Sequence, residues 1–251
     1  MEDSNKFKYV IQQADNSLIL GQRLSEWCGH GPVLEQDIAL TNISLDLIGQ
    51  ARLFYQYAAE LQGEGKSEDD LAYLRDAWDF HNVLLVEQPN GDFAQTIVRQ
   101  FFYDTFSCHF FEALAESKDE RLVSIAAKSH KEALYHMKWS GDWVIRLGDG
   151  TEESKERAQK AVNDLWSYKD EIIKPNAVDQ KAADEGYGVD LEQLKAKRDQ
   201  KITEVLNEAT LEIPESTYSH KGGKEGTHTE HLGFILAELQ FLQRAYPGNQ
   251  W

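Results

Sequence analysis

Apolar residues recur at intervals of three and four along most of the 251-residue chain. Because an α-helix has about 3.6 residues per turn, this spacing places them on one face of each helix. The predicted helices run approximately from Lys6 to Cys28, Val33 to Gln62, Asp69 to Trp78, Phe93 to Leu147 (a hairpin), Thr151 to Ile173, Leu191 to Ala209 and Thr229 to Leu242. The apolar run Val83 to Val86 has no strand partner nearby, so we predict irregular or helical structure there.

Glycine and proline mark the ends of these helices, at Gly29 to Pro32, Gly63 to Gly65, Gly148 to Gly150 and Pro175. Residues 176–188 are polar and predict a loop with a helical turn. No linker is long enough to divide the chain. The pattern therefore predicts one all-α domain over residues 1–251, an antiparallel bundle of long helices with smaller helices packed outside.

The central hairpin carries two polar residues on its apolar faces. Asp104 shares the face of Phe101, and His136 lies in the middle of the apolar stripe on the second helix. A buried unpaired carboxylate is costly, so both residues need partners or a metal. Two interpretations stay open: hydrogen bonds to each other or to buried water, or weak binding of one metal ion. Two protein ligands are too few for a tight metal site, which favours the first.

Composition narrows the classes of partner and compartment. The net charge of -17 argues against binding nucleic acid or an anionic membrane, because both require clustered cations. The N-terminus lacks the pattern of a secretory signal, and no stretch approaches the ~20 apolar residues of a membrane span. Both Cys28 and Cys108 lie on predicted apolar stripes and are expected to be buried thiols in a reducing compartment. We therefore expect a cytoplasmic protein.

Long antiparallel helices with inward polar groups suggest a carboxylate-bridged di-metal bundle, which needs a Glu-x-x-His pair from each of two helices. The only such pair is Glu225 with His228, among glycines that make a helix improbable. A complete di-iron site is therefore absent from the sequence.

Five stretches together resemble one protein family: GQRLSEWCGHGP (Gly21 to Pro32), LDLIGQAR (Leu45 to Arg52), LLVEQPNGDFA (Leu84 to Ala94), KEALYH (Lys131 to His136) and GGKEGTHTEHLGFILAELQFLQR (Gly222 to Arg244). The chain is similar to the structural, non-catalytic subunits of bacterial ring-1,2-phenylacetyl-CoA epoxidases, which are multicomponent di-iron monooxygenases. The resemblance covers nearly the whole chain and implies a ferritin-like fold.

The resemblance also implies a degenerate metal site. Where the related catalytic subunit has its six ligands, this chain has Ser17, Leu47, Gln50, Asp104, Ala133 and His136. Only Asp104 and His136 keep a ligand type. The implied role is therefore architectural: the chain would bind and stabilise the catalytic subunit, help to shape the acyl-CoA channel and have no catalytic centre or cofactor of its own.

The cofactors implied by the family lie in other subunits, with di-iron in the catalytic subunit and NADPH with flavin and iron–sulfur groups in the reductase. The implied partners are the catalytic subunit and the other epoxidase subunits. If phenylacetyl-CoA or coenzyme A also touches this chain, we expect the contact at the loops flanking the bundle, where Arg75, Asp76 and Trp78 offer a cation and an aromatic face, joined by Lys174 and Asn176.

Two other functions stay open. The chain could be a metal-binding enzyme in its own right, using Asp104 and His136 around one ion. It could also be a ferritin-like interaction module that serves a different partner.

Overall fold

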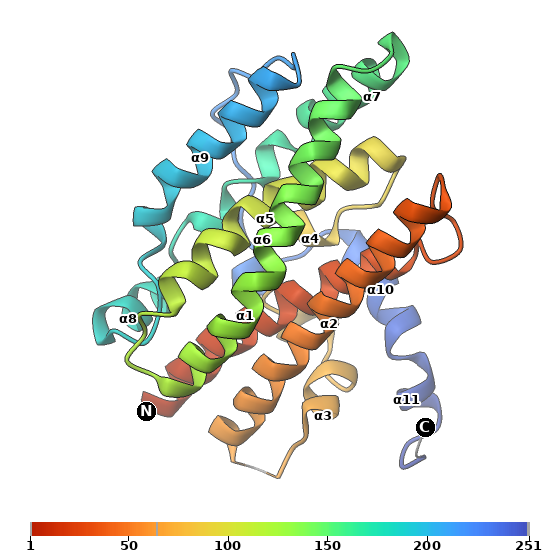
Figure 1. Ribbon diagram of the computed structural model, residues 1–251. Helices are drawn as coiled ribbons and strands as arrows, with labels where there is room; N and C mark the ends of the chain where they lie inside the picture. Colours follow the sequence, from red (N-terminus) through yellow and green to blue (C-terminus); the bar gives the residue numbers. More distant parts are fainter. Residues whose placement is uncertain (1, 64, 250–251) are drawn as a thin grey trace. The chain divides into compact units, whose positions relative to one another are not determined.

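The structure is a computed structural model that describes residues 2–63 and 65–249 (Figure 1). Every regular element in these residues is a helix and none is a strand, which confirms the predicted all-α bundle. The chain forms two compact units. The first, here called the α1–α2 unit, comprises Met1–Gln88 and Gly222–Trp251, and the second, the α5–α6 unit, comprises Pro89–Lys221. The single-domain organisation stays a prediction.

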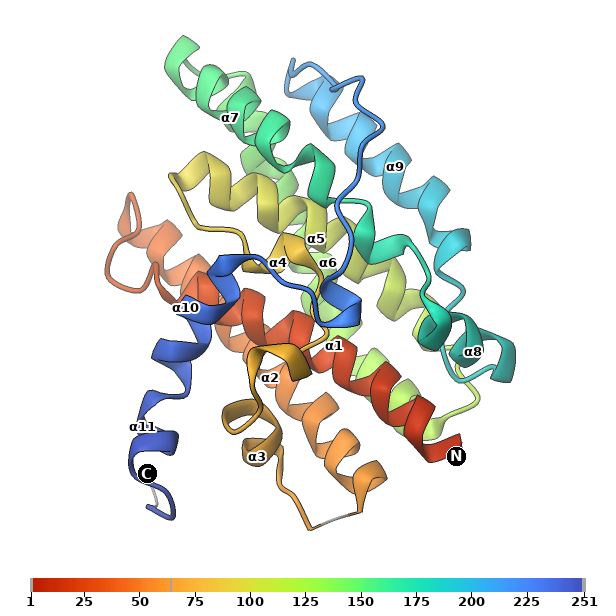
Figure 2. The same cartoon turned by 180° about the vertical axis from the view of Figure 1, so that it is seen from behind.

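Two long helices, α1 (Glu2–Ser25) and α2 (Leu34–Gln62), lie side by side in the first unit (Figure 2). They approach closely at Gly21, where a Cβ atom would come within 3.1 Å of the Ile48 side chain. The Ser44 hydroxyl donates a hydrogen bond to the Gly21 carbonyl across this contact, at 2.8 Å. The smaller helices of the unit are α3 (Glu68–Tyr73), η1 (Ala77–Asp79), α4 (Leu84–Glu87), η4 (Gly223–Glu225), α10 (Glu230–Leu239) and α11 (Phe241–Ala245).

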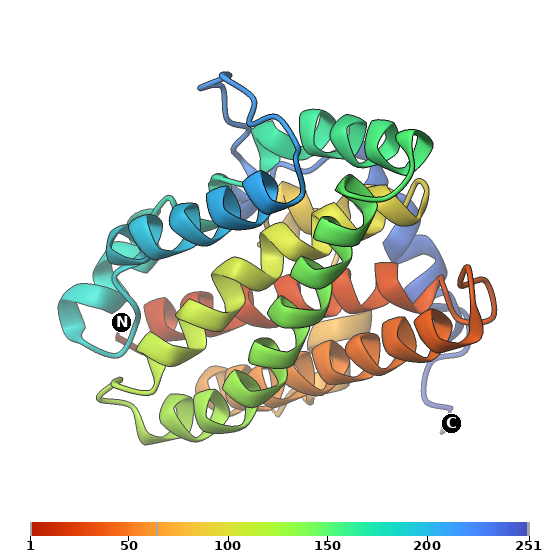
Figure 3. The ribbon, with the colours of Figure 1, turned by 45° about the horizontal axis from the view of Figure 1, so that its top comes forward.

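The α5–α6 unit is built on the predicted hairpin, observed as α5 (Phe93–Leu114) and α6 (Glu120–Gly148) (Figure 3). Asp92 and Asp119 begin these helices, since each carboxylate accepts hydrogen bonds from backbone amides of the first turn. The remaining helices are α7 (Glu152–Leu165), η2 (Trp166–Tyr168), η3 (Glu171–Ile173), α8 (Ala177–Glu185) and α9 (Leu191–Glu208).

The predicted helix from Thr151 to Ile173 is wrong in its second half. The α-helix α7 ends at Leu165, and two 3-10 turns follow. The buried guanidinium of Arg198 donates to the Lys169 carbonyl at 2.7 Å and to the Asp170 carboxylate at 2.6 Å. These tertiary bonds compete with continued helical pairing. The polar stretch after Pro175 is more regular than predicted, because Asn176 caps the helix α8.

The expectation for Cys28 is also wrong. Helix α1 ends at Ser25, and Cys28 lies beyond it in an exposed turn. The amides of Trp27 and Cys28 bond to carbonyls only three residues back, and Gly29 then takes the left-handed conformation at φ +80°. Cys108 is buried as predicted. None of the helices in the described residues is long and apolar enough to cross a bilayer.

Candidate functional site

The six positions aligned with metal ligands all lie on the four long helices. Ser17 is on α1, Leu47 and Gln50 on α2, Asp104 on α5, and Ala133 and His136 on α6; every one is at least 98% buried. This burial confirms the faces derived from the apolar pattern. Three of the positions belong to each compact unit.

None of the three positions in the α1–α2 unit has a carboxylate or an imidazole, and Gln50 offers only a neutral amide. The Ser17 hydroxyl donates to the Gln13 carbonyl of its own helix, at 3.1 Å. The Leu47 side chain lies beside Gly21 at the close approach of α1 and α2. A leucine side chain has no donor atom, and a serine hydroxyl already bonded within its helix is a poor substitute for a bridging carboxylate.

Asp104 is held by neutral hydrogen-bond partners in the α5–α6 unit. Its Oδ1 accepts from Gln100 Nε2 at 2.7 Å, and its Oδ2 lies 2.8 Å from the Ser140 hydroxyl, which is also 2.9 Å from the His136 carbonyl. Burial raises the pKa of the Asp104 carboxyl from its ordinary 3.8 to about 6, although His136 and the bonds from Ser140 and Gln100 lower it. The carboxyl therefore titrates near neutral pH and has partners for both oxygens.

The six residues do not fit a di-iron centre. Such a centre needs several carboxylates and two imidazoles, whereas these positions offer one of each. In residues 2–63 and 65–249, no three His, Cys, Asp or Glu side chains gather closely enough to hold a metal ion.

Arg75 belongs to the predicted coenzyme A contact, but its guanidinium faces inward. It forms an ion pair with the fully buried Asp15, donates to the Asp79 carbonyl at 2.7 Å, and lies over the Phe80 ring, 4.1 Å from its centroid. Asp15 also accepts from the Tyr55 hydroxyl at 2.6 Å and from the His81 amide at 2.8 Å. This network ties α1 and α2 to the segment after α3.

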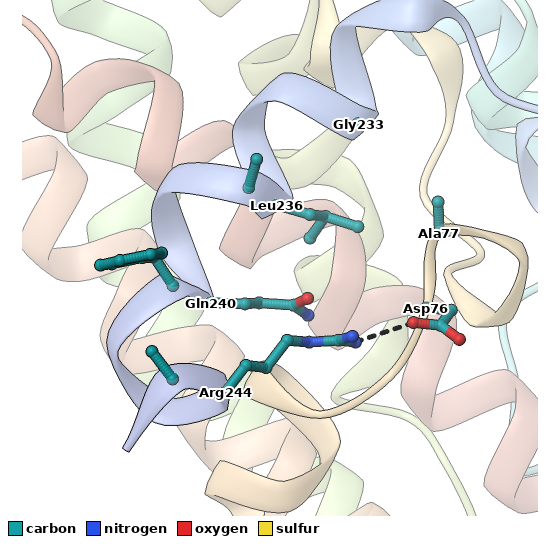
Figure 4. Close-up of a pocket in the computed structure, with 9 residues that line it drawn as sticks. Asp76, Ala77, Gly233, Leu236, Gln240 and Arg244 are labelled. Carbon is teal, nitrogen blue, oxygen red and sulfur yellow. Dashed lines mark hydrogen bonds and ion pairs between the residues drawn. The ribbon is translucent and has the colours of Figure 1, made fainter. Parts of the chain in front are cut away.

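The other residues of the predicted contact lie at the surface or cap helices. The indole of Trp78 is 79% exposed and lines a cavity of about 580 Å³ together with Lys8 and Lys66. Asp76 lines a second cavity, of about 530 Å³, where it pairs with Arg244 at 2.9 Å (Figure 4). In the other unit, Lys174 is exposed and Asn176 accepts hydrogen bonds from the Val178 and Asp179 amides. The coenzyme A contact stays a prediction.

Two features of the α1–α2 unit were missed from the sequence. One is an exposed apolar ridge on α2, formed by Leu34, Ile38, Leu45 and Ile48. Their spacing of four, seven and three residues was visible in the sequence. Only the structure shows that this second apolar face of α2 is exposed while the other is buried. The other is a buried ion pair between Glu87 of α4 and His228. The glycines around His228 made a helix improbable there, so the sequence offered no reason to pair His228 with Glu87.

The similarity to known proteins agrees with this architecture. The model of the family "Phenylacetic acid catabolic protein" matches residues 1–251, and the chain belongs to this family. Among curated proteins it is 51% identical over 243 residues to one of the subunits of the 1,2-phenylacetyl-CoA epoxidase of Escherichia coli (strain K12). That match covers 97% of this chain and 98% of the relative, so the two proteins correspond over their whole length. The family resemblance inferred from the sequence is confirmed.

Proposed function

We propose that this chain is the non-catalytic structural subunit of a phenylacetyl-CoA epoxidase, and that it binds and stabilises the di-iron catalytic subunit. The observation that carries the proposal is the chemistry of the six buried positions. Leu47 and Ala133 cannot ligate a metal, while Asp104 is bonded to Gln100 and Ser140. The chain has the long helices of a di-iron bundle but lacks the carboxylates and imidazoles that would ligate the metals.

The family resemblance implies the rest of the division of labour. The catalytic subunit supplies the di-iron centre, and a reductase that uses NADPH with flavin and iron–sulfur groups supplies electrons. This chain contributes rigid helices and buries apolar surface where it meets the catalytic subunit. Other epoxidase subunits complete the assembly in the cytoplasm.

The apolar ridge on α2 supports a partner-binding role. Leu34, Ile38 and Leu45 are 70, 52 and 61% exposed, and Ile48 is 37% exposed. Spacings of four, seven and three residues keep them on one helix face, which is the pattern of a surface that packs against another helix. Contiguous exposed apolar side chains on a soluble protein mark interaction surfaces.

A contact with the nucleotide end of the acyl-CoA is a secondary part of the proposal. The exposed indole of Trp78 offers a stacking face, and Lys8 and Lys66 beside it offer cations for phosphate. Arg75 would position this segment through Asp15 and would not itself bind phosphate, because its donors are used within the protein. Asp76, Lys174 and Asn176 are the remaining candidates.

The test is binding of the purified chain to the purified catalytic subunit, with Leu45→Glu as the variant. Placing a charge in the centre of a buried contact is expected to cost about 2 kcal/mol or more, which raises the dissociation constant about 30-fold. Leu242→Glu is the matched control, since it makes the same change at a 46% exposed leucine on α11. Its binding should stay close to that of the wild type.

Three outcomes would count against the proposal. A wild-type chain that does not bind the catalytic subunit removes the structural role. Equal binding by Leu45→Glu and the wild type removes the α2 ridge as the contact. Finally, about one metal ion per chain after iron-replete expression, lost in His136→Ala, would favour a metal-binding enzyme using Asp104 and His136.

A further inference from the structure

His228 lies with both ring nitrogens facing hydrogen-bond acceptors. Its Nε2 is 2.9 Å from the Phe80 carbonyl, and its Nδ1 is 3.3 Å from a carboxylate oxygen of Glu87. A neutral imidazole has only one N–H, so it could satisfy only one of these acceptors. The doubly protonated imidazolium bonds to the Phe80 carbonyl and also forms an ion pair with Glu87, although the Nδ1 contact is not aligned as a hydrogen bond. The geometry therefore favours a positive charge on His228 in the folded protein.

The buried carboxylate of Glu87 needs the positive charge of His228 as a partner. Its side chain is fully buried on α4, and it accepts hydrogen bonds from the Thr229 amide at 2.9 Å and the Asn82 side chain at 3.4 Å. Both partners are neutral, and a buried carboxylate without a cation is strongly unfavourable. The His228 ring supplies the cation at the same place where Thr229 supplies an amide. Two consecutive residues of the C-terminal segment thus hold one carboxylate.

The glycine-rich turn before His228 brings this segment onto the chain around η1 and α4. A Cβ atom at Gly223 would lie 2.3 Å from the Asn82 carbonyl, and one at Gly226 would lie 2.7 Å from the Trp78 carbonyl. The ring of His81 lies 3.1 Å from the Lys224 carbonyl in the same contact. The helices α10 and α11 follow directly, so their attachment begins at this turn.

We infer that Glu87 and His228 form a pH-sensitive clasp, which fastens the segment from Gly222 onward to α4 and to the loop that precedes it. The inference concerns the chain itself and does not depend on which partner it binds. Charged or titratable groups also surround the pair on the elements packed against it: Asp15 and Arg23 of α1, Arg75, His81 and Lys224.

The direction of the pH effect follows from the surroundings of the imidazole. Burial lowers the pKa of His228, but the Glu87 carboxylate and the Phe80 carbonyl outweigh it, and the pKa is raised above the ordinary 6.5. A group whose pKa is raised on folding stabilises the folded state below its unfolded pKa. That stabilisation is lost as the pH rises through the folded value. The clasp therefore holds while His228 is protonated, and it opens as the pH rises through the titration of the imidazole.

Nitrogen NMR of the full-length chain, labelled on histidine, tests the charge directly. The two ring nitrogens of His228, assigned by their loss in His228→Gln, should titrate together with a midpoint above the ordinary histidine value of about 6.5. A midpoint at or below that value would overturn the inference.

Hydrogen exchange read by mass spectrometry tests the fastening. After correction for intrinsic exchange, protection of α10 should fall about tenfold or more between about pH 6 and pH 9, the scale of losing a hydrogen bond to a charged group. Glu87→Gln should lower this protection and abolish its pH dependence. Asp76→Asn is the control, because it removes only the exposed pair with Arg244 and should leave the pH dependence intact. Wild-type protection that does not change with pH would refute the clasp, whether or not Glu87→Gln folds.

Discussion

Replacing Asp104 by asparagine isolates the energetic cost of a buried carboxylate in the α5–α6 unit. The amide has the same shape and can keep both contacts: its oxygen accepts from Gln100, and its nitrogen donates to the Ser140 hydroxyl, which then donates to the His136 carbonyl. The substitution therefore removes the titration and preserves the packing. Any pH dependence that disappears with it belongs to Asp104.

The magnitude follows from the pKa. Burial raises the pKa of Asp104 from 3.8 to about 6, and at about 1.4 kcal/mol per unit the full effect is about 3 kcal/mol. Because the folded state holds the proton more tightly, the wild type loses stability as the pH rises through this interval. About 1.4 kcal/mol of the loss falls between about pH 5 and pH 7.5, above the isoelectric point of about 4.8. The Asp104→Asn variant should not show this loss of stability.

Urea unfolding of both proteins across this range is the assay, and the difference between their unfolding free energies is the quantity to follow. It should shift by about 1.4 kcal/mol in favour of Asp104→Asn as the pH rises, while contributions from other groups cancel. His136→Gln is the companion variant: His136 lowers the pKa of Asp104, so removing it should move the transition to higher pH. A constant difference, or one that shifts toward the wild type, would refute the reasoning and indicate a carboxylate stabilised in its charged form.

Two further predictions concern the glycines and the cysteines. Gly223→Ala should destabilise the chain by about 1–3 kcal/mol, because its Cβ would collide with a backbone carbonyl. Gly233→Ala should raise the unfolding free energy by about 0.5–1 kcal/mol, since its Cβ meets open space on a helix; equal effects in urea unfolding would contradict the packing argument. The exposed Cys28 should react with a thiol reagent in the folded protein. Cys108 should react only on unfolding, because burial, with Glu112 and Asp104 nearby, raises its pKa to about 11; rapid modification of both thiols would disprove this.

The apolar spacing predicted the central hairpin to within a few residues, and it placed Asp104 and His136 on buried faces. It succeeded there because α6 has one apolar stripe and both helices have clear caps, although α5 is buried on nearly all of its faces and not on one alone. It failed for the helix after Thr151, because the Arg198 guanidinium that bonds to the Lys169 carbonyl comes from a distant part of the chain. It also placed Cys28 one turn too far along its helix, since periodicity alone does not locate the end of a helix.

At the candidate site, too, the sequence predicted some features and missed others. Which positions can ligate a metal is a matter of residue type, and the sequence already contained it. The direction of the Arg75 guanidinium was not accessible from the sequence, because Asp15, sixty residues away, determines it. The pairing of Glu87 with His228 is likewise a contact between remote segments.

The sequence by itself determined the helical class, the long helices and the family, because each depends on local periodicity or on the identity of single residues. Only the tertiary structure decided which polar groups are paired, which apolar face of α2 remains exposed, and where burial raises the pKa of Asp104 and the Glu87 contact raises that of His228. Burial and charge pairing depend on residues far apart in the chain, and the fold alone brings those residues together.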